Sequence, residues 1–234
     1  MFTKINRLVV LLVILTGSTS MLIAEHVILI HGLARTASSM GRIESRLLEE
    51  SYNVVNIDYP SREFEIPQLA RYVRQKIEEN TQDSKRIHIV THSMGGIIVR
   101  QIQNTEPIHN LGRVVMLSPP NQGSEIVDKL SHLSLFKKIN GPAGTQLGTN
   151  KNSFVRGLGP VNFDLGIITG CRTVNPILSL MIPGKDDGKV STNSAQVAGM
   201  RDYLVVPSSH TFIMQNSHAI EEVIYFLEHS RFRK

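Results

Sequence analysis

The sequence predicts an α/β fold with a mostly parallel central sheet and helices on both of its faces. Short apolar runs typical of strands alternate along the chain with apolar stripes at helical spacing. This alternation implies right-handed crossovers between parallel strands. The chain has 234 residues, of which 41% are hydrophobic and 19% are charged, as in ordinary globular proteins with one core. We therefore expect residues 25–234 to form a single domain.

Six apolar runs bounded by turn residues are the expected strands. The first run ends at His31 and Gly32, and the glycine permits a tight turn at the carboxyl end of the strand. The runs lie at residues 27–30, 53–57, 87–90, 114–117, 165–168 and 203–206, with residues 178–182 as a further candidate.

Four apolar stripes with spacings of three and four residues are the expected helices. Pro67 suits the first turn of the second helix. Glu221 and Glu222 stand early in the last helix, where the helix dipole favours acidic groups. The stripes are Ile43, Leu47 and Leu48; Leu69, Ala70, Val73 and Ile77; Ile97, Ile98 and Ile102; and Ile220, Val223, Ile224 and Leu227.

Residues 131–162 interrupt this alternation. The stretch contains five glycines and two prolines, with apolar residues such as Leu133, Phe136 and Ile139 scattered among them. A long irregular segment inside a compact domain is often functional or mobile. We interpret residues 131–162 as a small irregular cap or lid beside the site. The alternative is an inert excursion on the surface.

Residues 1–24 have the pattern of a secretory signal. Lys4 and Arg7 precede an unbroken apolar run at residues 8–15, and small polar residues follow at 16–20. The apolar run is far shorter than the roughly 18 residues expected of a spanning helix. We therefore predict a cleaved signal peptide and an exported protein, periplasmic or secreted. An uncleaved anchor in the membrane is the alternative.

The chain is only moderately basic. Its net charge is +5 at pH 7, and loss of residues 1–24, which contain two basic and no acidic residues, would reduce it to +3. The short basic segment 231–234 gives weak support for contact with anionic surfaces. We predict no nucleic-acid partner, and we expect a monomer. The single cysteine excludes an intramolecular disulfide.

Ser93 lies where the sequence changes from strand to helical periodicity. The segment Thr91-His92-Ser93-Met94-Gly95 is similar to the G-x-S-x-G turn, in which a strained strand-to-helix turn lifts a serine hydroxyl above the sheet. Thr91 replaces the first glycine, whereas Gly95 allows the helix to approach the strand closely. The same segment also fits a glycine-containing turn that binds an anion or nothing.

A serine nucleophile needs a base to take its proton, and the base needs an acid to orient it. Ligands of open α/β sheets bind outside the carboxyl ends of the strands. Of the nine histidines, only His31, His92 and His210 lie at such ends. His92 adjoins Ser93 in sequence, and neighbouring side chains in a strand point different ways. His210 is therefore the predicted base.

Asp186 and Asp187 are the candidate acids. Both follow an apolar run and lie between Ser93 and His210, which gives the order of serine, acid and histidine found with such turns. The Asp187-Gly188 turn would expose the carboxylate of Asp187, which we favour over Asp186. A solvated Asp-Gly turn is the alternative for both.

Attack of Ser93 on an acyl carbon would form an oxyanion that needs two amide donors. Met94 offers one amide at the start of the helix that follows the serine. Leu33 offers the other, because Gly32 lets the loop after the first strand turn inward. The residues expected to support these turns are His31, Gly32 and Gly95.

These motifs together resemble the α/β-hydrolase superfamily, and more narrowly the small bacterial lipases and the lipase-like hydrolases related to inositol deacylases. The resemblance rests on Val27-Ile-Leu-Ile-His-Gly-Leu, the turn at Ser93, Asp187-Gly-Lys-Val-Ser and His210. It extends from about Glu25 to the last helix. It implies a triad of Ser93, Asp187 and His210, with an oxyanion amide from the His-Gly-Leu loop.

We therefore predict a serine ester hydrolase of lipase or carboxylesterase type, which cleaves an acyl ester or lipid through an acyl-enzyme on Ser93 and could contact a lipid surface. A thioesterase or acyltransferase with the same triad is the alternative. A binding protein of the same fold without activity is a lesser one. We expect no cofactor and no metal site, because the sequence has no H-E-x-x-H or clustered ligands. A calcium ion held by backbone oxygens would leave no such pattern.

Overall fold

The computed structural model describes residues 25–233, so the predictions for residues 1–24 lie outside the described residues. Its sheet has six parallel strands in the order β2-β1-β3-β4-β5-β6. This confirms the predicted parallel α/β fold. The strands are β1 (His26–Ile30), β2 (Asn53–Ile57), β3 (Ile87–His92), β4 (Leu111–Leu117), β5 (Leu165–Gly170) and β6 (Asp202–Val206).

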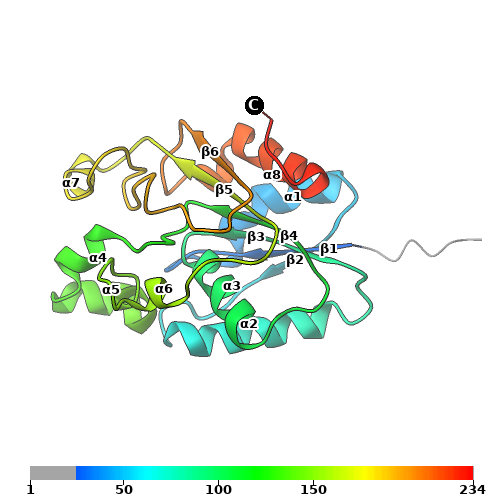
Figure 1. Cartoon of the computed structure of the whole chain (residues 1–234), viewed down its shortest axis with the longest axis horizontal. Coiled ribbons are helices and arrows are strands. Elements are labelled where there is room, and N and C mark those ends of the chain that lie inside the picture. The colour runs from blue at the N-terminus through cyan, green and yellow to red at the C-terminus, as the bar shows by residue number, and fades with distance from the viewer. Residues whose placement is uncertain (1–24, 234) are drawn as a thin grey trace, which may run out of the picture.

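Helices cover both faces of the sheet, as predicted (Figure 1). One face is covered by α2 (Ile66–Asn80) and α3 (Met94–Thr105), and the other by α1 (Gly41–Glu49) and α8 (Ser217–His229). Short 3-10 helices lie at Ala37–Met40 and Ile213–Gln215. Within residues 25–233, no helix has both the length and the apolar character needed to cross a bilayer.

Alternate side chains of the strands supply the two halves of the core. In β1, Ile28 and Ile30 pack with the residues of α2 and α3, whereas Val27 and Leu29 pack with those of α1 and α8. This division follows from the strand period of two residues. All four side chains are fully buried, and each such burial stabilises the fold by about 1.5–3 kcal/mol.

The starts of two helices follow local sequence signals. Glu65 caps α2 in a capping box with Gln68, and the Asn216 side chain accepts a hydrogen bond from the Ala219 amide at the start of α8.

One predicted core position is wrong. Leu48 of α1 was expected in the apolar stripe of this helix, but it is 54% exposed. It lies about 100° around the helix from buried Leu47, outside the apolar stripe.

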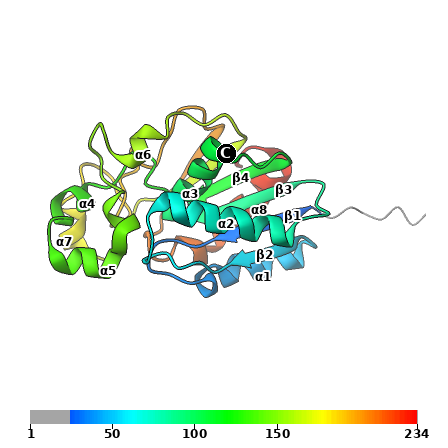
Figure 2. The ribbon, with the colours of Figure 1, turned by 90° about the horizontal axis from the view of Figure 1, so that it is seen from below.

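The segment predicted as an irregular cap is more regular than expected. It contains α5 (Ser134–Thr145) and α6 (Phe154–Gly157). The helix α5 bends at Gly141, whose φ of 65° favours glycine. The preceding helix α4 (Glu125–Leu130) lies at the same end of the molecule (Figure 2). We use the name cap for the residues 125–157, which begin before the predicted boundary.

The strand considered at residues 178–182 is wrong. These residues include the end of a short helix, α7 (Pro176–Ser179), and the turn after it. The proline suits the first turn of a helix, and the Asn175 side chain accepts a hydrogen bond from the Leu178 amide at 3.2 Å. Leu180 is 87% exposed and Ile182 is buried, and neither residue belongs to a strand of the sheet.

Candidate active site

Ser93 occupies a strained backbone position between β3 and α3. Its φ is 52° and its ψ is −122°, a conformation that costs a non-glycine residue about 1–3 kcal/mol. The amide of Ser93 donates to the Leu117 carbonyl oxygen at 2.8 Å, which anchors the turn to the end of β4. Ser93 is thereby placed at the carboxyl edge of the sheet with 8% of its surface exposed.

Two glycines allow the neighbouring backbone to approach this turn. A Cβ on Gly95 would lie 2.6 Å from the Ile30 carbonyl oxygen, so α3 begins directly against the end of β1. A Cβ on Gly32 would lie 3.1 Å from the Cβ of Ser93. The loop after β1 therefore passes next to Ser93, as the predicted supporting turns require.

A continuous pair of hydrogen bonds links the three predicted triad residues. Ser93 Oγ lies 3.0 Å from His210 Nε2, and His210 Nδ1 lies 2.9 Å from Asp187 Oδ2. Because the carboxylate can only accept, Nδ1 carries the proton, and Nε2 accepts from the serine hydroxyl. The His210 amide also donates to the Asp187 carbonyl oxygen at 2.8 Å. The three side chains are thus aligned for transfer of a proton from serine to histidine.

The two candidate acids face different partners. Asp187 is 1% exposed, and its Oδ1 accepts from the amides of Lys189 and Val190 at 3.0 and 2.9 Å. Asp186 instead accepts from the Gly188 amide at 2.7 Å and from the Ser179 hydroxyl at 2.6 Å. Only Asp187 of this pair reaches His210.

The carboxyl group of Asp187 is held in its charged form. Burial alone would raise its pKa, but attraction to His210 in its protonated form and hydrogen bonding with His210, Ser118 and the Val190 amide lower the pKa below its usual value. Gly170 makes room for this carboxylate, since a Cβ there would lie 3.0 Å from the Cβ of Asp187. An ionised acid can stabilise a positive charge on His210.

His31 hydrogen-bonds to the loop after β1 and makes no hydrogen bond with the Ser93 hydroxyl. Its Nδ1 donates to the Gly32 carbonyl oxygen at 2.9 Å, and its ring stacks on Tyr59 with 4.2 Å between centroids. The Tyr59 hydroxyl donates to the His31 carbonyl oxygen at 2.7 Å. Burial lowers the pKa of His31, although Asp58 opposes this effect. His31 therefore contacts the loop after β1 and Tyr59, and its role in supporting the site stays a prediction.

The amides of Leu33 and Met94 are available for a ligand. Met94 is the first residue of α3, where amides lack partners within the helix. Within residues 25–233, neither amide donates a hydrogen bond to a backbone or side-chain group outside the helices and strands. Leu33 lines the same pocket as Ser93. This arrangement fits the predicted oxyanion donors.

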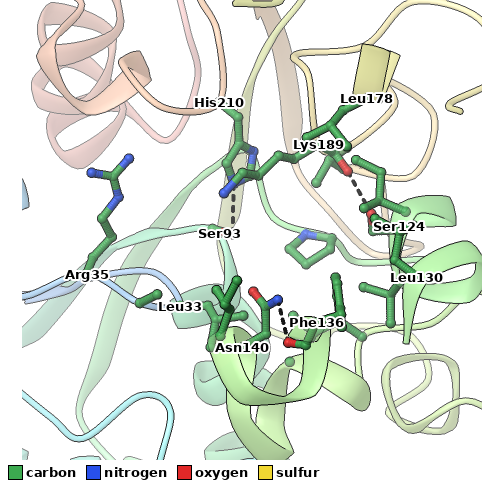
Figure 3. Close-up of a pocket in the computed structure, with 18 of the residues that line it drawn as sticks. Leu33, Arg35, Ser93, Ser124, Leu130, Phe136, Asn140, Leu178, Lys189 and His210 are labelled. Carbon is green, nitrogen blue, oxygen red and sulfur yellow. Dashed lines mark hydrogen bonds between the residues drawn. The ribbon is translucent and has the colours of Figure 1, made fainter. Parts of the chain in front are cut away.

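A largely apolar pocket of about 330 Å³ opens beside Ser93 (Figure 3). This volume is at the lower end of the range of about 300–1,000 Å³ typical of small-molecule sites. The cap forms much of its wall through side chains of α4 and α5, and Leu178 of α7 contributes from the other side. Its apolar wall includes Ile126, Val127, Leu130, Phe136, Ile139, Leu147 and Leu178.

Sequence reasoning missed three polar residues of this site. Ser118, directly after β4, helps to lower the pKa of Asp187, and Arg35 and Lys189 line the pocket. Ser118 follows an apolar strand run in the sequence, which is a signal for the carboxyl edge of the sheet. Arg35 lies two residues after the predicted His-Gly-Leu turn, and Lys189 directly follows the predicted Asp-Gly turn. Their positions next to these turns were the available signal.

The described residues contain no group of three or more His, Cys, Asp or Glu side chains arranged to hold a metal ion. The polar groups around Ser93 are instead the imidazole, the carboxylate and free amides. These groups can activate a hydroxyl and stabilise an oxyanion without a metal ion.

The parallel sheet, the serine at a strained strand-to-helix turn and the hydrogen-bonded histidine and aspartate define an α/β-hydrolase type of site. A sequence model of the alpha/beta hydrolase family matches residues 27–165. The chain belongs to this family. A search of curated proteins gave no significant match.

Solved structures share this fold at low sequence identity. The mature lipase BlEst2 of Bacillus licheniformis is 18% identical, with a TM-score of 0.65 over 86% of this chain and 91% of that chain. Phospholipase PlaB from Legionella pneumophila is 20% identical, with a TM-score of 0.64 over 74% of this chain and 46% of that chain. An extracellular α/β-hydrolase from a Paenibacillus species is 15% identical, with a TM-score of 0.57 over 89% and 99%.

Proposed function

We propose that the protein is a serine ester hydrolase of lipase or esterase type. One observation carries the proposal: the hydrogen-bonded series Ser93, His210 and Asp187 borders an apolar pocket. A serine activated in this way attacks acyl carbonyl carbons. Structures of the same fold include a lipase and a phospholipase, which supports an ester or lipid substrate.

The proposed reaction has two halves. Ser93 Oγ bonds to the acyl carbon while its proton passes to His210 Nε2, and the amides of Leu33 and Met94 bind the resulting oxyanion. Collapse of this intermediate breaks the ester bond, and His210 returns the proton to the leaving alcohol. Water then attacks the acyl-enzyme in the same way, releasing the acid. Asp187 orients His210 and stabilises its charge in both halves.

Covalent labelling tests this proposal. A fluorophosphonate should label the protein at Ser93, and labelling and hydrolysis of p-nitrophenyl butyrate should both be lost in Ser93→Ala. Labelling that persists in Ser93→Ala would reject Ser93 as the nucleophile. Ester products that exceed the free acid in dilute alcohol would identify an acyltransferase instead.

We also propose that the cap and α7 contact the lipid phase that holds the substrate. Exposed apolar side chains flank the pocket from two sides, with Leu135 and Ile139 on α5 and Ile177 on α7 exposed by 68%, 49% and 70%. Ile139 and its neighbour Phe136 also line the pocket. Exposed apolar groups around a binding site are typical of surfaces that meet lipid.

Sedimentation with phosphatidylcholine vesicles tests the lipid contact. The double variant Leu135→Asp, Ile177→Asp should bind vesicles more weakly than the wild type and retain hydrolysis of dissolved p-nitrophenyl butyrate. Leu48→Asp is a matched control, because Leu48 is also exposed but belongs to α1. Equal loss of binding in the control would argue against a role of the cap and α7.

A further inference from the structure

We propose that the site accepts esters whose leaving alcohol carries an anionic group, a phosphate or a carboxylate, which binds between Arg35 and Lys189. This inference rests on the proposed ester hydrolase function and names its substrate class. Both cationic residues line the pocket that contains Ser93 and His210. An anion in this position would pair with two positive charges beside the reacting bond.

The two cations have no protein partner in the part of the chain that the structure describes. Arg35 is half-buried and Lys189 is exposed. Within residues 25–233, the hydrogen bonds of Arg35 and Lys189 are made by their backbone atoms alone. Asp187 attracts Lys189, but its carboxylate is occupied by His210 and backbone amides. The guanidinium and ammonium groups are therefore free to bind a ligand.

Both residues are carried by the loops that form the candidate site. The Arg35 amide donates to the Gly32 carbonyl oxygen at 3.3 Å, in the loop that also presents Leu33. The Lys189 amide donates to Asp187 Oδ1 at 3.0 Å, and the Lys189 carbonyl oxygen accepts from the Ser124 hydroxyl at 2.7 Å. The backbone of each cation is thus fixed relative to Ser93 and His210.

Electrostatics favour an anion in this space. Partial desolvation, followed by the positive charge of Arg35, lowers the pKa of Lys189. The charges of Lys189 and Arg35 also contribute to lowering the pKa of His92, next to Ser93. The two cations therefore act on the same small region and repel each other. An anion between them would relieve this repulsion and form charge-assisted hydrogen bonds.

The pocket walls assign the anionic group to the alcohol side of the ester. In Figure 3, Arg35 lies on one side of Ser93, and apolar Leu130 and Phe136 lie on the other. The Lys189 side chain extends in the direction of His210. Since His210 donates a proton to the leaving alcohol, that alcohol lies beside His210, and the acyl chain lies against the apolar wall.

Matched soluble esters test the anion site. The anionic substrate is 3-(butyryloxy)benzoate, and the neutral one is 3-(butyryloxy)benzamide. The ratio of their kcat/KM values should fall about tenfold in Arg35→Gln and in Lys189→Met. Lys85→Met is a charge-matched control at the opposite edge of the sheet, and it should leave the ratio unchanged. An unchanged ratio in both pocket variants would overturn the inference.

The neutral ester separates the two proposals. Failure of the wild type to hydrolyse this ester, together with absence of labelling at Ser93, would reject the proposed function. Hydrolysis that depends on Ser93, without a change of the ratio in the variants, would reject only the anion site. Because both esters are measured in the same preparation, partial misfolding of a variant cancels from the ratio.

Phosphate esters distinguish a single bound group from attraction to a charged surface. The first substrate is dihexanoyl phosphatidic acid dissolved as monomers, and its neutral counterpart is dihexanoylglycerol. The ratio of their kcat/KM values should be about tenfold lower in Lys189→Met than in the wild type. Long-chain phosphatidic acid in phosphatidylcholine vesicles should show the same relative loss. A loss confined to vesicles would show that the cations attract an anionic surface, and it would overturn the subsite.

Discussion

The imidazole of His92 donates a hydrogen bond from Nε2 to the backbone carbonyl oxygen of His210 at 3.0 Å. This bond joins the residue before Ser93 to the residue that supplies the candidate base. Burial, followed by repulsion from His210 in its protonated form, lowers the pKa of His92 well below its usual value of 6.5. The ring is therefore neutral. Its other nitrogen, Nδ1, has no hydrogen-bond partner among the described residues.

We expect His92→Phe to lower activity more than stability. Loss of the bond to His210 should reduce kcat for p-nitrophenyl butyrate about tenfold through misplacement of the imidazole. The free energy of unfolding should change by less than about 1 kcal/mol, because removal of the unpaired buried Nδ1 offsets the lost hydrogen bond. His92→Gln, whose amide can donate to the same oxygen, should recover part of kcat. If His92→Gln recovered none of the lost kcat, the result would contradict a positioning effect.

Asp187→Asn should be far more damaging to activity than Asp186→Asn. An amide at residue 187 cannot stabilise a positively charged His210, and kcat should fall by about 10³- to 10⁴-fold. The side-chain oxygen of Asp186→Asn can still accept the hydrogen bond from the Gly188 amide. This variant should therefore reduce kcat by less than about tenfold. Hydrolysis of p-nitrophenyl butyrate by the two purified variants measures both effects. Equal losses would argue against Asp187 as the orienting acid.

The stability of the protein should fall as the pH drops below about 6.5. Burial lowers the pKa of His31, His88 and His92 in the folded protein. The unfolded chain therefore binds protons more readily than the folded protein in this pH window. Each histidine can remove up to about 1.4 kcal/mol per pH unit below its unfolded pKa. Urea unfolding at pH 7.5, 6.5 and 5.5 measures the effect, and a flat profile would contradict it.

Alanine at Gly95 should destabilise the fold, whereas alanine at Gly96 should be tolerated. A Cβ on Gly95 would meet two backbone oxygens, those of Ile30 and His31, at 2.6 and 2.9 Å. These atoms cannot move without separating α3 from β1, so we expect a loss of about 2 kcal/mol. A Cβ on Gly96 would meet the flexible Met116 side chain at 2.8 Å, and helix propensity offsets this contact. Denaturant unfolding of both variants provides the comparison.

The sheet could be predicted because each strand carries its own signal. Apolar runs such as 27–30 and 87–90 end in turn residues at the edge where ligands bind. The same logic selected Ser93 and His210, which the structure brings within hydrogen-bonding distance. The order along the chain and the Asp187-Gly188 turn favoured the acid that contacts His210, although its carboxylate is buried and not exposed as expected.

The cap could not be predicted in the same way, because its helices are short and depend on contacts distant in sequence. Gly141 and Pro142 interrupt the periodicity of α5, although the chain continues as helix after the bend. Leu178 belongs to an apolar run that fits a strand by composition, but Pro176 and the Asn175 cap start a helix there. Ser118 belongs to no sequence motif, because its effect on Asp187 depends on two segments that are far apart in the sequence.

The apolar wall of the pocket should set the preferred length of the acyl chain. Leu130 of α4 lies on the side of the pocket away from Arg35 (Figure 3). Leu130→Trp should fill this end, lowering kcat/KM for p-nitrophenyl octanoate by about tenfold, since each buried methylene contributes about 0.8 kcal/mol. The value for p-nitrophenyl acetate should change by less than about twofold, because its acyl group stays near Ser93. Leu48→Trp, at an exposed position of α1, controls for a general effect of tryptophan. An equal loss with acetate and octanoate would show that the acyl chain lies elsewhere.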